Sequence, residues 1–243
     1  YNEALYNILT STFTSAGLKI YQEDGSELAW DLYGEPIELA EGVTVKLTDG
    51  AGMLSPLFHP GYLRKFMEYT CKDSKKINLF VDTLADWQDT DDLKRLNGAE
   101  SYDYRMKGYS YGPRNFYIQV SREVGLLRGF DPELFGEIKD DIVYWGGGNI
   151  NYLTMSEKLL RALLKNDLLV DRIIQLRKEG KLTGRVFRDL TGIPETEENI
   201  YAPSGWIKVE ITAKVGKAVD RIEAVVKKRG LAKRPYMVAE WKR

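Results

Sequence analysis

Alternating and clustered hydrophobic positions predict several short strands in the first half of the chain. Asp24-Gly25 separates two strand-like runs and predicts a β-hairpin, because both positions of such a tight turn adopt positive φ. Further strands are expected in the sequences PIEL, GVTVKLTDG, KKINLFVDTLADW and RNFYIQVSREV, which lie at residues 36–39, 42–50, 75–87 and 114–124.

Elsewhere apolar residues recur every three or four positions, which is the spacing of one helix face. This pattern predicts helices over residues 5–13, from Pro60 to about residue 70, and over residues 156–178. Near the C-terminus SGWIKVEITAK alternates almost perfectly and predicts a strand. The following KAVDRIEAVVKKRG has apolar residues at helical spacing and a terminal glycine, and predicts a helix.

Together these elements predict an α+β protein: a mainly antiparallel sheet with flanking helices and an inserted helical subdomain. The expected division is a strand-rich α+β part at residues 1–124, a helical insertion at 125–203, and a returning strand with a basic C-terminal helix at 204–243. A chain of 243 residues has ample length for one large or two small domains.

Composition narrows the chemistry that is available. The single cysteine, Cys71, excludes an internal disulfide and a multi-cysteine zinc site, and the single His59 excludes sites that need two histidines. No apolar run approaches the roughly 18 residues of a membrane span, so no membrane partner is expected.

The net charge is −1, but the segment from Trp206 onward holds eleven basic and four acidic residues. This asymmetry suits a phosphate-binding surface or an ordinary solvated face.

Three carboxylates form a candidate metal site. Asp82 and Asp86 share one face of the expected strand at 75–87, and Glu210 lies on the strand near the C-terminus. Carboxylates from neighbouring strands commonly hold Mg²⁺ or Mn²⁺, because these cations prefer oxygen ligands and leave water positions open for phosphate. Lys214 shares the face of Glu210 and is expected to contact phosphate. The alternative is a row of ordinary solvent-facing charges.

The segments FHPGYLRKFMEYT, INLFVDTLADW and GWIKVEITAK resemble, in this order, three segments of plasmid rolling-circle replication initiators of the Rep_trans family. The resemblance implies a DNA-binding protein that nicks one strand, in which the three carboxylates hold the divalent metal and a tyrosine forms a link to the DNA. It also allows a relative that has kept the scaffold and lost the nicking activity.

The tyrosine position of that family falls on Val120 in this chain. Tyr117, three residues away, is the candidate catalytic nucleophile, and Tyr109 and Tyr111 stay open as alternatives.

Three other features receive plainer interpretations. Glu137-Ile138-Lys139 has the Glu-x-Lys spacing of metal-dependent nucleases, but Asp131 lies too close upstream for the usual strand pair. The glycines of YWGGGN are not followed by Lys-Ser/Thr and predict a flexible loop rather than a phosphate-binding one. His59 precedes Pro60 and is expected to begin a helix or to pack.

The run SYDYRMKGYSYGPRNFY, residues 101–117, mixes aromatic and basic side chains. This mixture suits single-stranded nucleic acid, and it equally suits a protein–protein contact. The 15 tyrosines, the near-neutral net charge and the lack of a complete catalytic set favour a second hypothesis, a structural or assembly component of a virus or phage particle. The expected partners are DNA under the first hypothesis and further copies or assembly partners under the second. The expected location is the cytoplasm or, under the second hypothesis, the virion.

Overall fold

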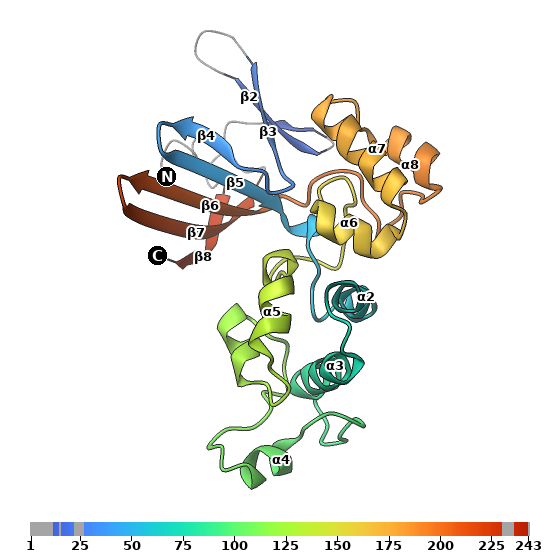
Figure 1. The fold of residues 1–243 in the computed structure, drawn as a ribbon, viewed down its shortest axis with the longest axis vertical. Coiled ribbons are helices and arrows are strands. Elements are labelled where there is room, and N and C mark those ends of the chain that lie inside the picture. The colour runs from blue at the N-terminus through green and yellow to red at the C-terminus, as the bar shows by residue number, and fades with distance from the viewer. Residues whose placement is uncertain (1–11, 15, 22–26, 230–235, 243) are drawn as a thin grey trace. The chain divides into compact units, whose positions relative to one another are not determined.

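The computed structural model describes residues 12–14, 16–21, 27–229 and 236–242. The chain forms two compact units: a sheet unit of residues 1–53 and 149–243, and a helical unit of residues 54–148. The sequence-based division placed its boundaries after residues 124 and 203. The fold class is α+β with antiparallel sheets, as predicted (Figure 1).

The sheet unit contains two antiparallel sheets (Figure 1). The smaller sheet has the strand order β1-β2-β3, with β1 at Thr12–Phe13, β2 at Gly17–Tyr21 and β3 at Glu27–Asp31. The larger sheet has the order β4-β5-β6-β7-β8, with β4 at Ile37–Ala40, β5 at Val43–Asp49, β6 at Trp206–Val215, β7 at Ala218–Lys228 and β8 at Tyr236–Lys242.

One apolar core joins the two sheets. Alternate residues of β5 and β6, among them Leu47 and Val209, point to the same face, and β2 and β3 contribute Ile20 and Trp30 to the same cluster. The other fully buried members are Leu18, Leu32, Val45, Ile207, Ile211 and Val226. The alternation read from the sequence therefore places one side of β6 in the core, where its apolar residues leave water.

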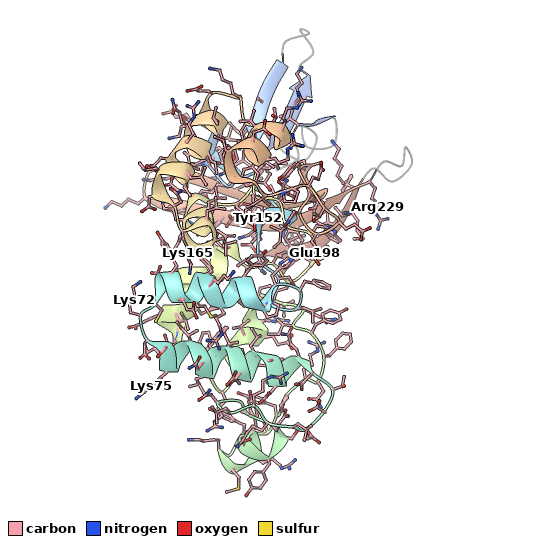
Figure 2. All side chains as sticks on the ribbon, turned by 90° about the vertical axis from the view of Figure 1, so that its right-hand side faces the viewer. Lys72, Lys75, Tyr152, Lys165, Glu198 and Arg229 are labelled. Carbon is pink, nitrogen blue, oxygen red and sulfur yellow. The ribbon has the colours of Figure 1, made fainter. Side chains whose placement is uncertain are left out.

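Among its described residues the sheet unit also contains the α-helices α6 at Glu157–Leu164, α7 at Asp167–Lys178 and α8 at Gly184–Thr191, and the short 3-10 helix η1 at Gly50–Gly52. Each of these α-helices begins at a side-chain cap, provided by Ser156, Asn166 and Thr183, which accept hydrogen bonds from otherwise unpaired backbone N–H groups. Tyr152, labelled in Figure 2, stacks on Phe187 of α8 with ring centroids 5.5 Å apart.

The buried carboxylate of Asp49 joins three segments of the sheet unit at the end of β5. It accepts hydrogen bonds from the backbone N–H and hydroxyl of Ser204, at 2.9 and 2.7 Å, and from the hydroxyl of Thr154 at 2.9 Å. Asn151 lies at the edge of the same network. Burial raises the pKa of Asp49, and the bonds from Ser204 and Thr154 oppose that rise.

The helical unit is built from α2 at Pro60–Thr70, α3 at Ser74–Gln88, α4 at Ser101–Met106 and α5 at Pro132–Ile138, with short 3-10 helices η2 at Ser121–Leu126 and η3 at Lys139–Asp141. Figure 2 shows α2 and α3 side by side, with Lys72 and Lys75 at the end where they are joined. A parallel bridge between Leu54 and Ile142 brings the two ends of the unit together. None of the described helices is both long and apolar enough to cross a membrane.

The strand predicted at 75–87 is wrong, because this segment is helix α3. Asp73 accepts hydrogen bonds from the backbone N–H groups of Lys75 and Lys76 and so begins the helix. Ile77, Phe80 and Leu84 are buried at helical spacing on one side. The β-prone residues of INLFV suggested a strand, but the three- and four-residue spacing was the stronger signal.

Two further element predictions are wrong. Residues 218–228 form β7 rather than a helix, because they pair along their full length with β6 through a hairpin at Gly216 (φ 58°). Residues 114–124 form no strand, and their last part belongs to η2. The turn at Asp24-Gly25 and most of the expected helix at 5–13 lie outside the described residues.

We expect Asp49→Ala to lower the free energy of unfolding by about 2–4 kcal/mol, because the donors of Ser204 and Thr154 would stay buried without an acceptor. Urea unfolding of the full chain measures the difference. Glu41→Ala, an exposed substitution in the turn before β5, is the control and should change stability by less than about 0.5 kcal/mol. Equal effects of the two substitutions would contradict the role given to Asp49.

Candidate functional site

Asp82 and Asp86 lie one helical turn apart on α3 and hold the loop that follows the helix. One carboxylate oxygen of Asp82 accepts hydrogen bonds from the backbone N–H of Asn97 at 3.0 Å and from its side-chain amide at 2.8 Å. Asp86 is 0% exposed, and it accepts from the guanidinium of Arg95 at 2.7 Å and from the Arg95 backbone N–H. Both carboxylates are thus engaged with residues 95–97.

The loop lies directly against the Asp86 carboxylate. A Cβ atom at Gly98 would lie only 1.8 Å from an oxygen of Asp86, so this position accepts glycine and no larger residue without displacement of the loop. Arg95 also pairs with Asp89. The hydrogen bonds that the Arg95 guanidinium donates to Asp89 and Asp86 raise its pKa.

The premise of the predicted metal site is wrong. Asp82 and Asp86 lie on a helix of the helical unit, and Glu210 lies on β6 of the sheet unit, so the three do not belong to neighbouring strands. Within the described part of the chain no group of three or more His, Cys, Asp or Glu residues is arranged to hold a metal ion. Binding of Mg²⁺ or Mn²⁺ stays a prediction from the sequence.

Glu210 belongs to a ladder of charges on the face of the large sheet opposite the core. The register places Lys46, Glu210, Glu223 and Lys242 side by side across β5, β6, β7 and β8. Lys208, only 9% exposed, lies 3.4 Å from Glu210 and 3.5 Å from Glu223, and Lys242 lies 3.0 Å from Glu223. The polar row of the alternating sequence is therefore an ion-pair ladder.

Charge attraction dominates at the centre of this ladder. Burial by itself raises the pKa of Glu223, but the positive charges of Lys208 and Lys242 outweigh it and leave the pKa below its usual value. Lys214, predicted to contact phosphate, lies at the exposed end of β6, where its backbone N–H donates to Gly42 at 2.8 Å.

Tyr117, the predicted nucleophile, lies in an irregular segment of the helical unit and not on a strand. Its ring packs on Phe116 with centroids 4.0 Å apart. The two alternatives belong to a different group of rings, in which Tyr109 and Tyr111 lie 5.1 Å apart and both contact Tyr104. Tyr117 instead lines a pocket of about 450 Å³, which we call the aromatic pocket.

The sequence analysis missed Glu123, which organises this region. The buried carboxylate of Glu123 accepts hydrogen bonds from the indole N–H of Trp87 at 2.9 Å and from the guanidinium of Arg114 at 2.8 Å. Arg114 in turn donates to the side chain of Gln119 at 2.9 Å. A lone glutamate in an apolar stretch carries little signal in one sequence, because its partners lie 9 and 36 residues away.

The remaining chemical motifs also serve local structure. Asp131 caps α5 by accepting from the backbone N–H of Leu134 at 2.9 Å, and it pairs with Lys76 at 2.8 Å. His59, as expected, begins a helix: it is the residue before α2.

Comparisons with known proteins point away from DNA. A family model described as type II secretion system protein K matches residues 62–143, which is about a third of the chain and lies within the helical unit. One chain of the GspK-GspI-GspJ complex from the type 2 secretion system of enterotoxigenic Escherichia coli has a similar fold. It is 15% identical, with a TM-score of 0.58, and the likeness covers 86% of this chain and 82% of that one. No curated protein sequence matches the chain.

These findings overturn the resemblance to replication initiators, the nicking function and the DNA partner. They equally overturn the hypothesis of a virus or phage component. The structure supplies a physical reason for the error: of the three segments that carried the resemblance, INLFVDTLADW is a helix where the initiator pattern needs a strand. Short motifs of common residues matched without a shared fold.

We expect Lys208→Ala to lower the free energy of unfolding by about 1–3 kcal/mol at pH 7, because Glu210 and Glu223 lie opposite each other and would lose the positive charge they share, leaving Glu223 with Lys242 alone. Lys214→Ala, on the same face of the same strand, is the matched control and should change it by less than about 0.5 kcal/mol. Since the pKa of Glu223 is lowered in the folded protein, the ladder stabilises above the unfolded pKa and loses its effect as the pH falls through the folded one. A Lys208→Ala deficit that persists in full at acidic pH would rule out this explanation.

Glu100 provides a test with the opposite pH dependence. It is 4% exposed, and burial together with the charges of Asp86 and Asp89 raises its pKa to about 7. A raised carboxyl pKa means that stability is highest below the unfolded value and is lost as the pH rises towards 7. Glu100→Gln should remove this loss and stabilise the protein by about 1–3 kcal/mol at pH 8, with little change at pH 4. Denaturation curves of the wild type and of Glu100→Gln at pH 4 and pH 8 measure this difference in stability.

Proposed function

We propose that this chain is a GspK-like minor pseudopilin of a type II secretion system. The observation that carries the proposal is the agreement of two comparisons: the match to protein K covers most of the helical unit, and the fold likeness extends to 86% of the chain, which includes the sheet unit. The family match bears on the helical unit alone, and the fold likeness extends to the sheet unit.

The partners that follow are GspI-like and GspJ-like proteins, since the similar chain was crystallised in a GspK-GspI-GspJ complex. The proposed location of this chain is the cell envelope, where type II secretion components reside, and not the cytoplasm that was expected from the sequence. The carboxylates of α3 agree with a role in binding other proteins, because they hold the loop after the helix in one conformation.

Co-expression with the GspI and GspJ homologues of the source organism tests the proposal. The expected result is a ternary complex that elutes as one species on size-exclusion chromatography, with each protein present. Deletion of the gene should reduce secretion of type II clients to the level of a strain that lacks the secretion channel, and a plasmid copy should restore it. A chain that forms no complex and whose deletion leaves secretion unchanged would overturn the proposal. Supercoiled plasmid incubated with the chain and Mn²⁺ should stay intact.

A further inference from the structure

The aromatic pocket of the helical unit has a wall of unusual chemistry. Of the eleven residues that line it, none is charged, and four are aromatic: Phe58, Tyr117, Tyr144 and Trp145. Its volume of about 450 Å³ lies within the range of ligand-binding pockets. A wall of this kind recognises flat apolar surface and does not attract a charged group.

One side of the pocket is held in place by the only histidine. The backbone N–H of Ser55 donates to Nδ1 of His59 at 3.0 Å, so Nε2 carries the ring proton and donates to the carbonyl of Gly148 at 2.9 Å. The Phe58 ring lies directly on Gly148, where an added Cβ would approach it to 3.2 Å. The Phe58 ring is exposed, but the segment that carries it is therefore held in place by the His59 hydrogen bonds and by Gly148.

The opposite side is fixed by Gln88 and Glu123. The side-chain oxygen of Gln88 accepts a hydrogen bond from the backbone N–H of Ile118 at 3.3 Å. The guanidinium of Arg114 donates both to the carboxylate of Glu123 and to the side-chain oxygen of Gln119. Because that oxygen is taken, the amide N–H₂ group of Gln119 is the part of this side chain left to donate to a ligand. The hydroxyl of Tyr117 is a second donor on this wall.

We propose that the aromatic pocket binds an uncharged, proline-containing segment of a partner protein in the polyproline II conformation. Such a segment offers proline rings to the aromatic walls, and its backbone carbonyls have no internal hydrogen bonds, so they accept from donors such as Gln119 and Tyr117. Its backbone is already extended before binding, which lowers the entropic cost. Charged peptides find no counter-charge in the lining. The inference is independent of the proposed secretion role, because it rests on the pocket alone.

Calorimetric titration of the full chain with an acetylated, amidated polyproline peptide of about ten residues tests the proposal. A Gly-Ser peptide of equal length and a neutral oligosaccharide are the comparison ligands. The expected result is saturable binding of the polyproline peptide alone, accompanied by a change in tryptophan fluorescence, since Trp145 lines the pocket.

Tyr117→Ala should weaken this binding by about tenfold or more, and Tyr117→Phe, which keeps the ring and loses the donor, should weaken it less. Tyr102→Ala is the matched control, because Tyr102 is 65% exposed on α4 and does not line the pocket. Thermal unfolding of each variant separates a binding defect from misfolding. The proposal fails if polyproline does not bind, if the Gly-Ser peptide or the oligosaccharide binds as well, or if folded Tyr117→Ala and Tyr117→Phe both bind like the wild type.

Discussion

The antiparallel pairing of β5 with β6 is the constraint on which the sheet unit depends. It joins residues 43–49 to residues 207–213, which are separated by the whole helical unit and by three helices. Closing so long a segment costs conformational entropy, and the compensating contacts are the buried faces of both strands and the hydrogen bonds to Asp49. Since Asp49 bonds to Thr154 and Ser204, the chain's departure from and return to the sheet are fixed together.

Buried and half-buried carboxylates play the corresponding part in the helical unit. Asp82, Asp86 and Glu123 each accept hydrogen bonds from a segment that has little regular structure, and so they order the stretch between α3 and α5. Asp82 and Asp86, which the sequence suggested as metal ligands, here hold the loop that follows α3. The helical unit ordered in this way also contains the aromatic pocket.

Particular segments show how far the sequence predicted the fold. Alternation identified β5 and β6, and helical spacing identified α2 and the run at 156–178, which the structure divides into α6 and α7. For α3 the residues of INLFV favoured a strand, yet their spacing buries Ile77, Phe80 and Leu84 on one helix face. For β7 the spacing favoured a helix, and pairing with β6 overrode it. The premise of the candidate metal site was wrong for the same reason, since it assumed that α3 was a strand.

The sequence by itself determined the α+β class, the alternation of β6 and the starts of α2 and α6, because these depend on neighbours within a few residues. Only the tertiary structure decided that Lys208 faces two glutamates, that Arg95 and Asn97 occupy the carboxylates of α3, and that Phe58, Tyr117 and Trp145 share one pocket. Most of those partners belong to different helices, strands or loops of the chain. A short sequence pattern cannot predict these contacts, because they form only when each unit folds and brings its separate elements together.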